Sequence, residues 1–319
     1  MLPARASHYY SHSSPCNARA ANPALGLLRP SLLGSAQPPS WLAVLFCWLL
    51  VSWFTPTSHA DRFDTAHVAL PPWMAGKANR IWAKQINDRG TLHRLRVRLG
   101  NPKNYEALIQ EGINGNYDFL ILPQHIGIYL LKDHAYTIIA VGGYDMDIVF
   151  ITSADELSSI EDIQGKTVGF PDPLAYVSIM AQRLLDKRQY KYSKVFYGHH
   201  DTVTRKVLER ELPVGVVVEQ SLAPLDHSAK LALKNIYKIS SPSFVLALSK
   251  SDTPKALQQK MTSTLLSTNQ ERLKLFPEWQ DQQHYSLSKM YEKEKYAVEF
   301  LRKHLKATRD SSSSQAATK

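Results

Sequence analysis

The hydrophobic pattern of the first part of the chain alternates between short apolar runs and amphipathic segments. Apolar runs at 67–70 and 117–122 predict strands, and so does the segment 95–99, in which apolar residues alternate with arginines. The segments between them, 76–87 and 105–112, carry apolar residues at helical spacing and predict helices. This alternation predicts an α/β fold built on a mostly parallel sheet.

The pattern changes character in the middle of the chain. Apolar runs at 136–141 and 148–152 predict two strands joined by Gly142-Gly143-Tyr144-Asp145. We expect the chain to cross from one lobe to another here and to return along the apolar run 236–248. A further strand is predicted at 214–219.

A βαβ unit is predicted between these crossings. Gly165-Lys166 leads into a short strand that stops at Pro171-Asp172-Pro173, and a second strand ends before His199-His200-Asp201. Open α/β sheets bind ligands beside such carboxyl-terminal strand ends. Gly165-Lys166-Thr167 does not indicate a nucleotide-binding P-loop, because Ile160 occupies the position of a required glycine and a strand follows the motif.

Several short motifs together resemble the phosphate/phosphite/phosphonate type of periplasmic solute-binding protein, the receptor of ABC transporters. They are Leu70-Pro71, Pro102-Lys103-Asn104-Tyr105-Glu106-Ala107-Leu108, Gly115-Asn116-Tyr117-Asp118-Phe119, Gly165-Lys166-Thr167-Val168, Asp172-Pro173 and Gly198-His199-His200-Asp201. Their order and spacing carry the resemblance across nearly the whole exported chain. It implies a two-lobed α/β fold of periplasmic binding protein type 2. Each lobe would be an open, mostly parallel sheet flanked by helices, with a double-crossover hinge between them.

The resemblance also implies a ligand site. Tyr105 matches an aromatic residue of the family's cleft, and His200 matches a loop histidine. The family's glycine-proline loop corresponds to residues 122–125, but its usual tyrosine is missing near Ile126. The Ser-Thr-Ser run that holds the phosphonate oxygens at a helix N-terminus is replaced by Ala175-Tyr176-Val177. The candidate ligand-binding residues are Tyr105, Gln124, His125, Asp172, Tyr176, His199, His200 and Asp201.

Two other interpretations of these residues stay open. One is that the histidines are surface residues and Tyr176 is a packing residue. The other is that residues of the His199-His200-Asp201 loop bind a metal, for which a third ligand such as His125 would come from the other lobe. Without the Ser-Thr-Ser hydroxyls, we expect weak or no binding of small alkylphosphonates. A larger organic ligand that stacks on Tyr105 or Tyr176 is expected to bind better.

The N-terminal 60 residues have the features of a secretory signal peptide. They contain no Asp or Glu, three arginines, and an uncharged apolar run of 14 residues at 41–54 that is followed by Ser58-His59-Ala60. The run is shorter than the roughly 20 residues of a membrane-spanning helix. We expect cleavage after Ala60 and a periplasmic location; an uncleaved anchor and a start further into the chain are the alternatives.

Composition excludes several kinds of site. Both cysteines, Cys16 and Cys47, lie in the leader, and bulky Phe46 disfavours a lipoprotein anchor at Cys47. The exported chain therefore has no thiol for a disulfide, a zinc-thiolate site or a nucleophile. Its 35 basic against 28 acidic residues give a net charge of +7, which either steers an anion or is simply a solvated surface. No sequence feature indicates nucleic-acid binding, a cofactor or catalysis.

The sequence therefore predicts a monomeric, non-enzymatic receptor that captures a small polar or anionic solute between two lobes. Its partner is an ABC permease or, as an alternative, a membrane sensor that docks the same fold. The predicted organisation is leader 1–60, lobe one 61–145, lobe two 146–240, and a return to lobe one with C-terminal helices over 241–308. A disordered tail is expected over 309–319, after a helix at 289–305.

Overall fold

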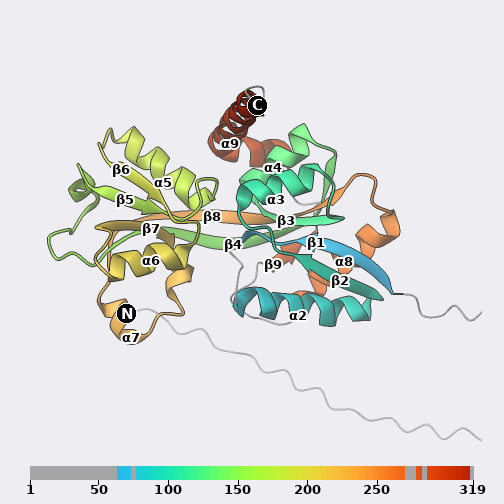
Figure 1. The fold of residues 1–319 in the computed structure, drawn as a ribbon. Helices are drawn as coiled ribbons and strands as arrows, with labels where there is room; N and C mark the ends of the chain where they lie inside the picture. Colours follow the sequence, from blue (N-terminus) through green and yellow to red (C-terminus); the bar gives the residue numbers. More distant parts are fainter. Residues whose placement is uncertain (1–62, 73–76, 270–277, 282–285, 317–319) are drawn as a thin grey trace, which may run out of the picture. The chain divides into compact units, whose positions relative to one another are not determined.

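The computed structural model describes residues 63–72, 77–269, 278–281 and 286–316. The leader, with its predicted cleavage site, lies outside the described residues. In the first part of the chain, strand and helix alternate as predicted (Figure 1). The elements are β1 (Asp64–Ala69), α2 (Lys77–Leu92), β2 (Leu95–Gly100), α3 (Tyr105–Ile113), β3 (Phe119–Pro123) and α4 (Gln124–Asp133).

Two strands of 17 residues each run the length of the sheet, and the second parallel unit lies between them in sequence. These long strands are β4 (Tyr136–Thr152) and β8 (Lys234–Lys250). The elements between them are η2 (Ile160–Ile163), β5 (Thr167–Phe170), α5 (Tyr176–Lys187), β6 (Ser193–Phe196), α6 (His200–Leu208), β7 (Val214–Val218), η3 (Glu219–Leu222) and α7 (His227–Leu231). The chain continues with α8 (Lys255–Thr268), β9 (Glu278–Gln280) and α9 (Leu287–Ala316).

The strand order is β2-β1-β3-β8-β4-β7-β5-β6, with β9 paired to β4. Strands β1, β2 and β3 are parallel to one another, and so are β5, β6 and β7. Antiparallel β4 and β8 pair along their whole lengths and connect these two parallel groups. Each lobe is thus an open, mostly parallel sheet, and the chain crosses between lobes twice, which confirms the predicted fold class.

The prediction of two separate strands at 136–141 and 148–152 is wrong. The segment around Gly142 and Gly143 is not a turn but the middle of β4, paired with β8 from Gly142↔Val245 through Asp147↔Ser240. Glycine permits a turn without requiring one, and here neither glycine has a positive φ. The backbone hydrogen bonds of this segment are satisfied by β8, so the extended conformation prevails.

Helices cover both faces of the second parallel group (Figure 1). Phe150 and Val216 pack into the same core as Ile179 of α5. Their sequence neighbours on the strands, Ile151 and Val217, point the opposite way and pack with Val203 and Val207 of α6. Helices α5 and α6 therefore lie on opposite faces of the sheet, which separates the residues that follow β5 from the interior side chains of α6.

Helix α9 is longer than the sequence predicted. The helix expected over 289–305 begins at Leu287 and continues to Ala316, so residues 309–316 are helical where a disordered tail was expected. Each residue added to an existing helix gains a backbone hydrogen bond without a new nucleation cost, so a segment without apolar residues can extend one. Helix α9 packs against both α4 and α5, and its residue Glu294 contacts Tyr176 at the start of α5.

Candidate ligand-binding site

The candidate site begins where two parallel strands end. Strand β3 ends at Pro123, and α4 starts at once with Gln124 and His125. In the other lobe β5 ends at Phe170, and the Asp172 loop leads into α5 at Tyr176. Four of the predicted residues (Gln124, His125, Asp172 and Tyr176) lie in these two connections, and all four are buried.

Asp172 accepts two backbone hydrogen bonds, one from its own loop and one from the other lobe. The Leu174 N–H donates to its Oδ1 at 2.8 Å, and the Tyr105 N–H at the start of α3 donates to its Oδ2 at 3.3 Å. Burial raises the pKa of the Asp172 carboxyl above its ordinary value, against the opposing effect of these two hydrogen bonds. Tyr105 is itself 4% exposed, so the structure brings these two predicted residues together in a closed contact.

His125 also bridges the two connections. Its Nε2 lies 3.0 Å from the Leu174 carbonyl oxygen, and its ring centroid lies 5.4 Å from that of Tyr176. A carbonyl only accepts hydrogen bonds, so Nε2 carries the proton and Nδ1 of the neutral ring is an acceptor. Burial lowers the pKa of His125 to about 4, so the ring is neutral at physiological pH.

Helix α9 contributes a buried carboxyl that the sequence gave no reason to select. Tyr176 donates its hydroxyl hydrogen to Glu294 Oε1 at 3.3 Å. Burial raises the pKa of Glu294 to about 7, although the charges of Lys293 and Arg183 act in the opposite direction. Glu294 is 3% exposed, so its carboxyl has little access to water.

Unsatisfied polar atoms are frequent on the helices that follow β3 and β5 and on α9. The described residues contain eight buried side-chain nitrogen or oxygen atoms without a hydrogen-bond partner, and five of these belong to four residues of α4, α5 and α9. The five atoms are Gln124 Nε2 and Oε1, His125 Nδ1, Ser178 Oγ and Glu294 Oε2. Gln124, His125, Tyr176, Ser178 and Glu294 are called the buried polar cluster below. A buried polar atom without a partner costs about 1–3 kcal/mol, so these residues are a candidate site for a solute that would pair with them.

The three predicted residues after β6 lie apart from this cluster. His199 and Asp201 are exposed, whereas His200 is half-buried, and its Nδ1 accepts a hydrogen bond from the Val218 N–H at 3.4 Å. Burial lowers the pKa of His200 to about 4. None of the hydrogen bonds of these three residues reaches the buried polar cluster. Across the described part of the chain, no group of three or more His, Cys, Asp or Glu residues could hold a metal ion.

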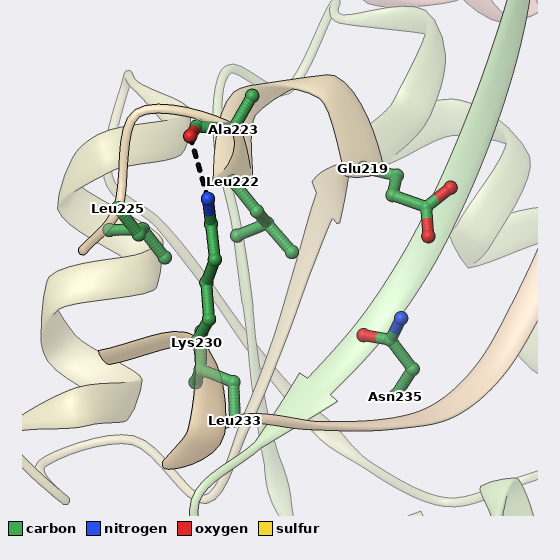
Figure 2. A pocket seen from close by; sticks show the side chains of 7 residues that line it. All are labelled: Glu219, Leu222, Ala223, Leu225, Lys230, Leu233 and Asn235. Atoms are coloured by element: carbon green, nitrogen blue, oxygen red, sulfur yellow. Dashed lines mark hydrogen bonds between the residues drawn. The ribbon is translucent and has the colours of Figure 1, made fainter. Parts of the chain in front are cut away.

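Two surface pockets lie elsewhere in the molecule. One, of about 350 Å³, is lined by η3, α7 and the start of β8, and Figure 2 shows Lys230 reaching across it to the Ala223 carbonyl. The other lies between α4 and α9 beside the Asp133–Arg302 ion pair. Neither is lined by a residue of the buried polar cluster.

Sequence reasoning missed two residues of the cluster. Ser178 lies in the first turn of α5, directly after the Ala175-Tyr176-Val177 segment that replaces the family's hydroxyl run. One hydroxyl is therefore retained at this helix N-terminus, and inspecting the next residue could have found it. Glu294 has no such signal, because Lys293 and Lys295 beside it are typical of a solvated helix face.

Several solved structures are similar to this fold. PhnD1 from Prochlorococcus marinus in complex with methylphosphonate is 13% identical, covers 75% of this chain and 98% of its own, and has a TM-score of 0.59. A binding protein component of an ABC phosphonate transporter from Pseudomonas aeruginosa is 14% identical, covers 78% and 99%, and has a TM-score of 0.59. A Xanthomonas citri protein bound to chloride ion is 10% identical, covers 75% and 99%, and has a TM-score of 0.60. The fold is that of a two-lobed periplasmic binding protein.

The family follows from the sequence match. A family model described as the periplasmic substrate-binding protein of phosphonate ABC transporters matches residues 83–290. The chain belongs to this family, as the motifs predicted, and the family consists of periplasmic substrate-binding proteins, not enzymes. No curated protein matches the chain. In the part of the chain that the structure describes, no helix is both long enough and apolar enough to cross a membrane.

Proposed function

We propose that this protein captures a small polar solute at the buried polar cluster and delivers it to an ABC permease. The observation that carries the proposal is the concentration of unpartnered buried atoms on α4, α5 and α9. Gln124 and His125 follow β3 directly, and Ser178 lies in the first turn of the helix that follows β5. Open α/β sheets bind ligands at such strand ends. A solute that satisfies them would gain the hydrogen bonds that the ligand-free protein lacks.

Lobe closure is the second part of the proposal. Strands β4 and β8 form the two connections between the lobes, and the Tyr105–Asp172 contact closes them. Small rotations within two paired strands allow the lobes to move as rigid bodies around a bound solute. The conformation with Asp172 bonded to Tyr105 corresponds to the closed state.

Ser178 offers a sharp test of the site. Replacing Ser178 with alanine removes a buried hydroxyl that has no partner, so we expect unchanged or slightly higher stability of the ligand-free protein. If the hydroxyl binds the solute, the same change lowers affinity by roughly tenfold. The measurement is mass spectrometry of small molecules that co-purify with the protein from its native envelope, followed by calorimetric titration with the compound recovered.

The matched control is Thr204→Val in α6. Thr204 Oγ1 is also buried without a partner, but α6 covers the opposite face of the sheet from α5. The control should bind the recovered compound as the wild type does. Equal losses in both variants, or no co-purified compound at all, would contradict the proposed site.

We also infer export and cleavage after Ala60. The acid-free leader, its apolar run and Ser58-His59-Ala60 support this inference. N-terminal sequencing of protein isolated from the native envelope is expected to read Asp61-Arg62-Phe63. Retention of residues 41–54 in the isolated protein would instead indicate a membrane anchor.

A further inference from the structure

We propose that the buried polar cluster binds a solute through a positively charged amine, and that Glu294 holds this ammonium group. This inference rests on the proposed function and specifies the chemistry of the solute. The family resemblance implies an anionic ligand. The side chains of this cluster and of Asp172 instead include carboxyl groups, which favour a cation.

The first argument is the balance of charge. The cluster and the adjoining Asp172 present two carboxyl groups, and none of these residues carries a positive charge. A phosphonate dianion here would keep the Asp172 and Glu294 carboxyls protonated, because like charges repel strongly in a site of low dielectric constant. An ammonium group would neutralise one of them. The alanine, tyrosine and valine at the start of α5 are consistent with this difference, since the oxyanion-binding hydroxyls are replaced there.

The second argument is the direction of the unsatisfied hydrogen bonds. His125 Nδ1 is an acceptor because Nε2 donates to the Leu174 carbonyl, and Gln124 Oε1 is an acceptor as well. Glu294 Oε2 becomes a third acceptor when a ligand cation ionises the carboxyl. An ammonium group donates three hydrogen bonds and accepts none. Gln124 Nε2 and Ser178 Oγ remain as donors for a neutral oxygen elsewhere on the solute. The ligand therefore combines an amine with a hydroxyl, carbonyl or ether oxygen.

The third argument is that nearby cations do not already neutralise Glu294. The Arg183 guanidinium lies 4.5 Å from the Tyr296 ring centroid, and the Lys293 ammonium lies 5.3 Å from the Phe244 ring centroid. Their charges lower the pKa of Glu294, but burial raises it more. Tyr176 donates to Oε1, and Oε2 is without a hydrogen-bond partner in the described residues. A ligand cation at Oε2 would supply the missing partner and ionise the carboxyl, which releases its proton to the solvent.

Calorimetric titration of the exported chain with three small probes tests this inference. Ethanolamine carries an amine and a hydroxyl, glycerol carries hydroxyls alone, and methylphosphonate carries the anion of the family's ligands. At pH 6.5 we expect ethanolamine to bind and to release protons, detected as a dependence of the heat on the buffer. Glu294→Gln should weaken this binding roughly tenfold to a hundredfold and abolish the proton release. Glu292→Gln, an exposed position of the same helix, should change neither.

Absence of ethanolamine binding up to about 10 mM, a binding free energy weaker than ~3 kcal/mol, would overturn the inference. Glycerol binding as tight as that of ethanolamine, or tighter binding of methylphosphonate, would overturn it as well. The proposed function is tested separately. If an anionic or uncharged solute co-purifies and requires Ser178, the amine inference fails while the solute-binding role stands.

Discussion

Replacing Glu294 with glutamine is expected to stabilise the ligand-free protein at alkaline pH. Burial raises the pKa of this carboxyl from 4.5 to about 7, so the folded state holds a proton that the unfolded state has already lost. The loss of folding stability caused by this pKa difference is absent below pH 4.5, grows as the pH rises and is complete above pH 7. It amounts to about 3 kcal/mol at 1.36 kcal/mol per pKa unit.

The measurement is urea denaturation of both proteins between pH 4 and pH 8. The stability difference between Glu294→Gln and the wild type should be near zero at pH 4 and reach about 3 kcal/mol in favour of the variant at pH 8. The comparison of two proteins at each pH cancels the titration of all other groups. Glu292→Gln is the control, because this carboxylate is exposed on the same helix. A difference that does not change with pH would contradict the buried, unpaired state of Glu294.

His125 is expected to make the protein sensitive to acid. Its pKa is lowered from 6.5 to about 4 by burial, so below pH 6.5 the unfolded state binds a proton that the folded state excludes. Stability contributed by the neutral ring is therefore complete above pH 6.5 and is lost as the pH falls toward 4. The loss is about 3 kcal/mol at pH 4. His200 contributes in the same direction, and we expect less from it because its side chain is half-buried.

His125→Gln tests this expectation because glutamine retains an N–H donor for the Leu174 carbonyl but does not titrate. The variant is expected to lose stability at pH 7, where a well-packed ring is replaced, and to lose about 3 kcal/mol less than the wild type between pH 7 and pH 4. His227→Gln, at an exposed position of α7, should follow the wild type at every pH. Parallel curves for the wild type and His125→Gln would show that the His125 ring is not held neutral.

Local patterns were sufficient to predict most of the fold. The strands and helices of the first lobe could be predicted from the spacing of apolar residues, because this spacing differs between a strand and a helix and shows within a few residues of sequence. The long strand β4 could not be predicted in this way, because Gly142 and Gly143 have the composition of a turn. Their extended conformation depends on pairing with β8, which is far away in sequence. The length of α9 was also missed, because composition alone does not show where an established helix ends.

Residues of the candidate site could be predicted from the sequence only where they lie in or beside a recognisable loop at the end of a strand. The resemblance to a known family led to Tyr105 and Asp172, and the structure joins them through a hydrogen bond. Glu294 could not be found, because a glutamate between two lysines on a helix is usually solvated. Only the packing of α9 against α4 and α5 buries it. Whether any predicted residue binds the ligand stays a prediction, and His199 and Asp201, both exposed, have the least support.

The most direct test of the proposed site is a crystal structure of the protein purified from its native envelope with no ligand added. The account predicts electron density for one small molecule between the lobes, within hydrogen-bond distance of Gln124, Ser178 and Glu294. Ser178→Ala protein prepared in the same way should show weaker density or none at this position. Density confined to the pocket of Figure 2 would contradict the proposed site. So would a protein that carries a bound solute while its buried polar cluster is closed and empty.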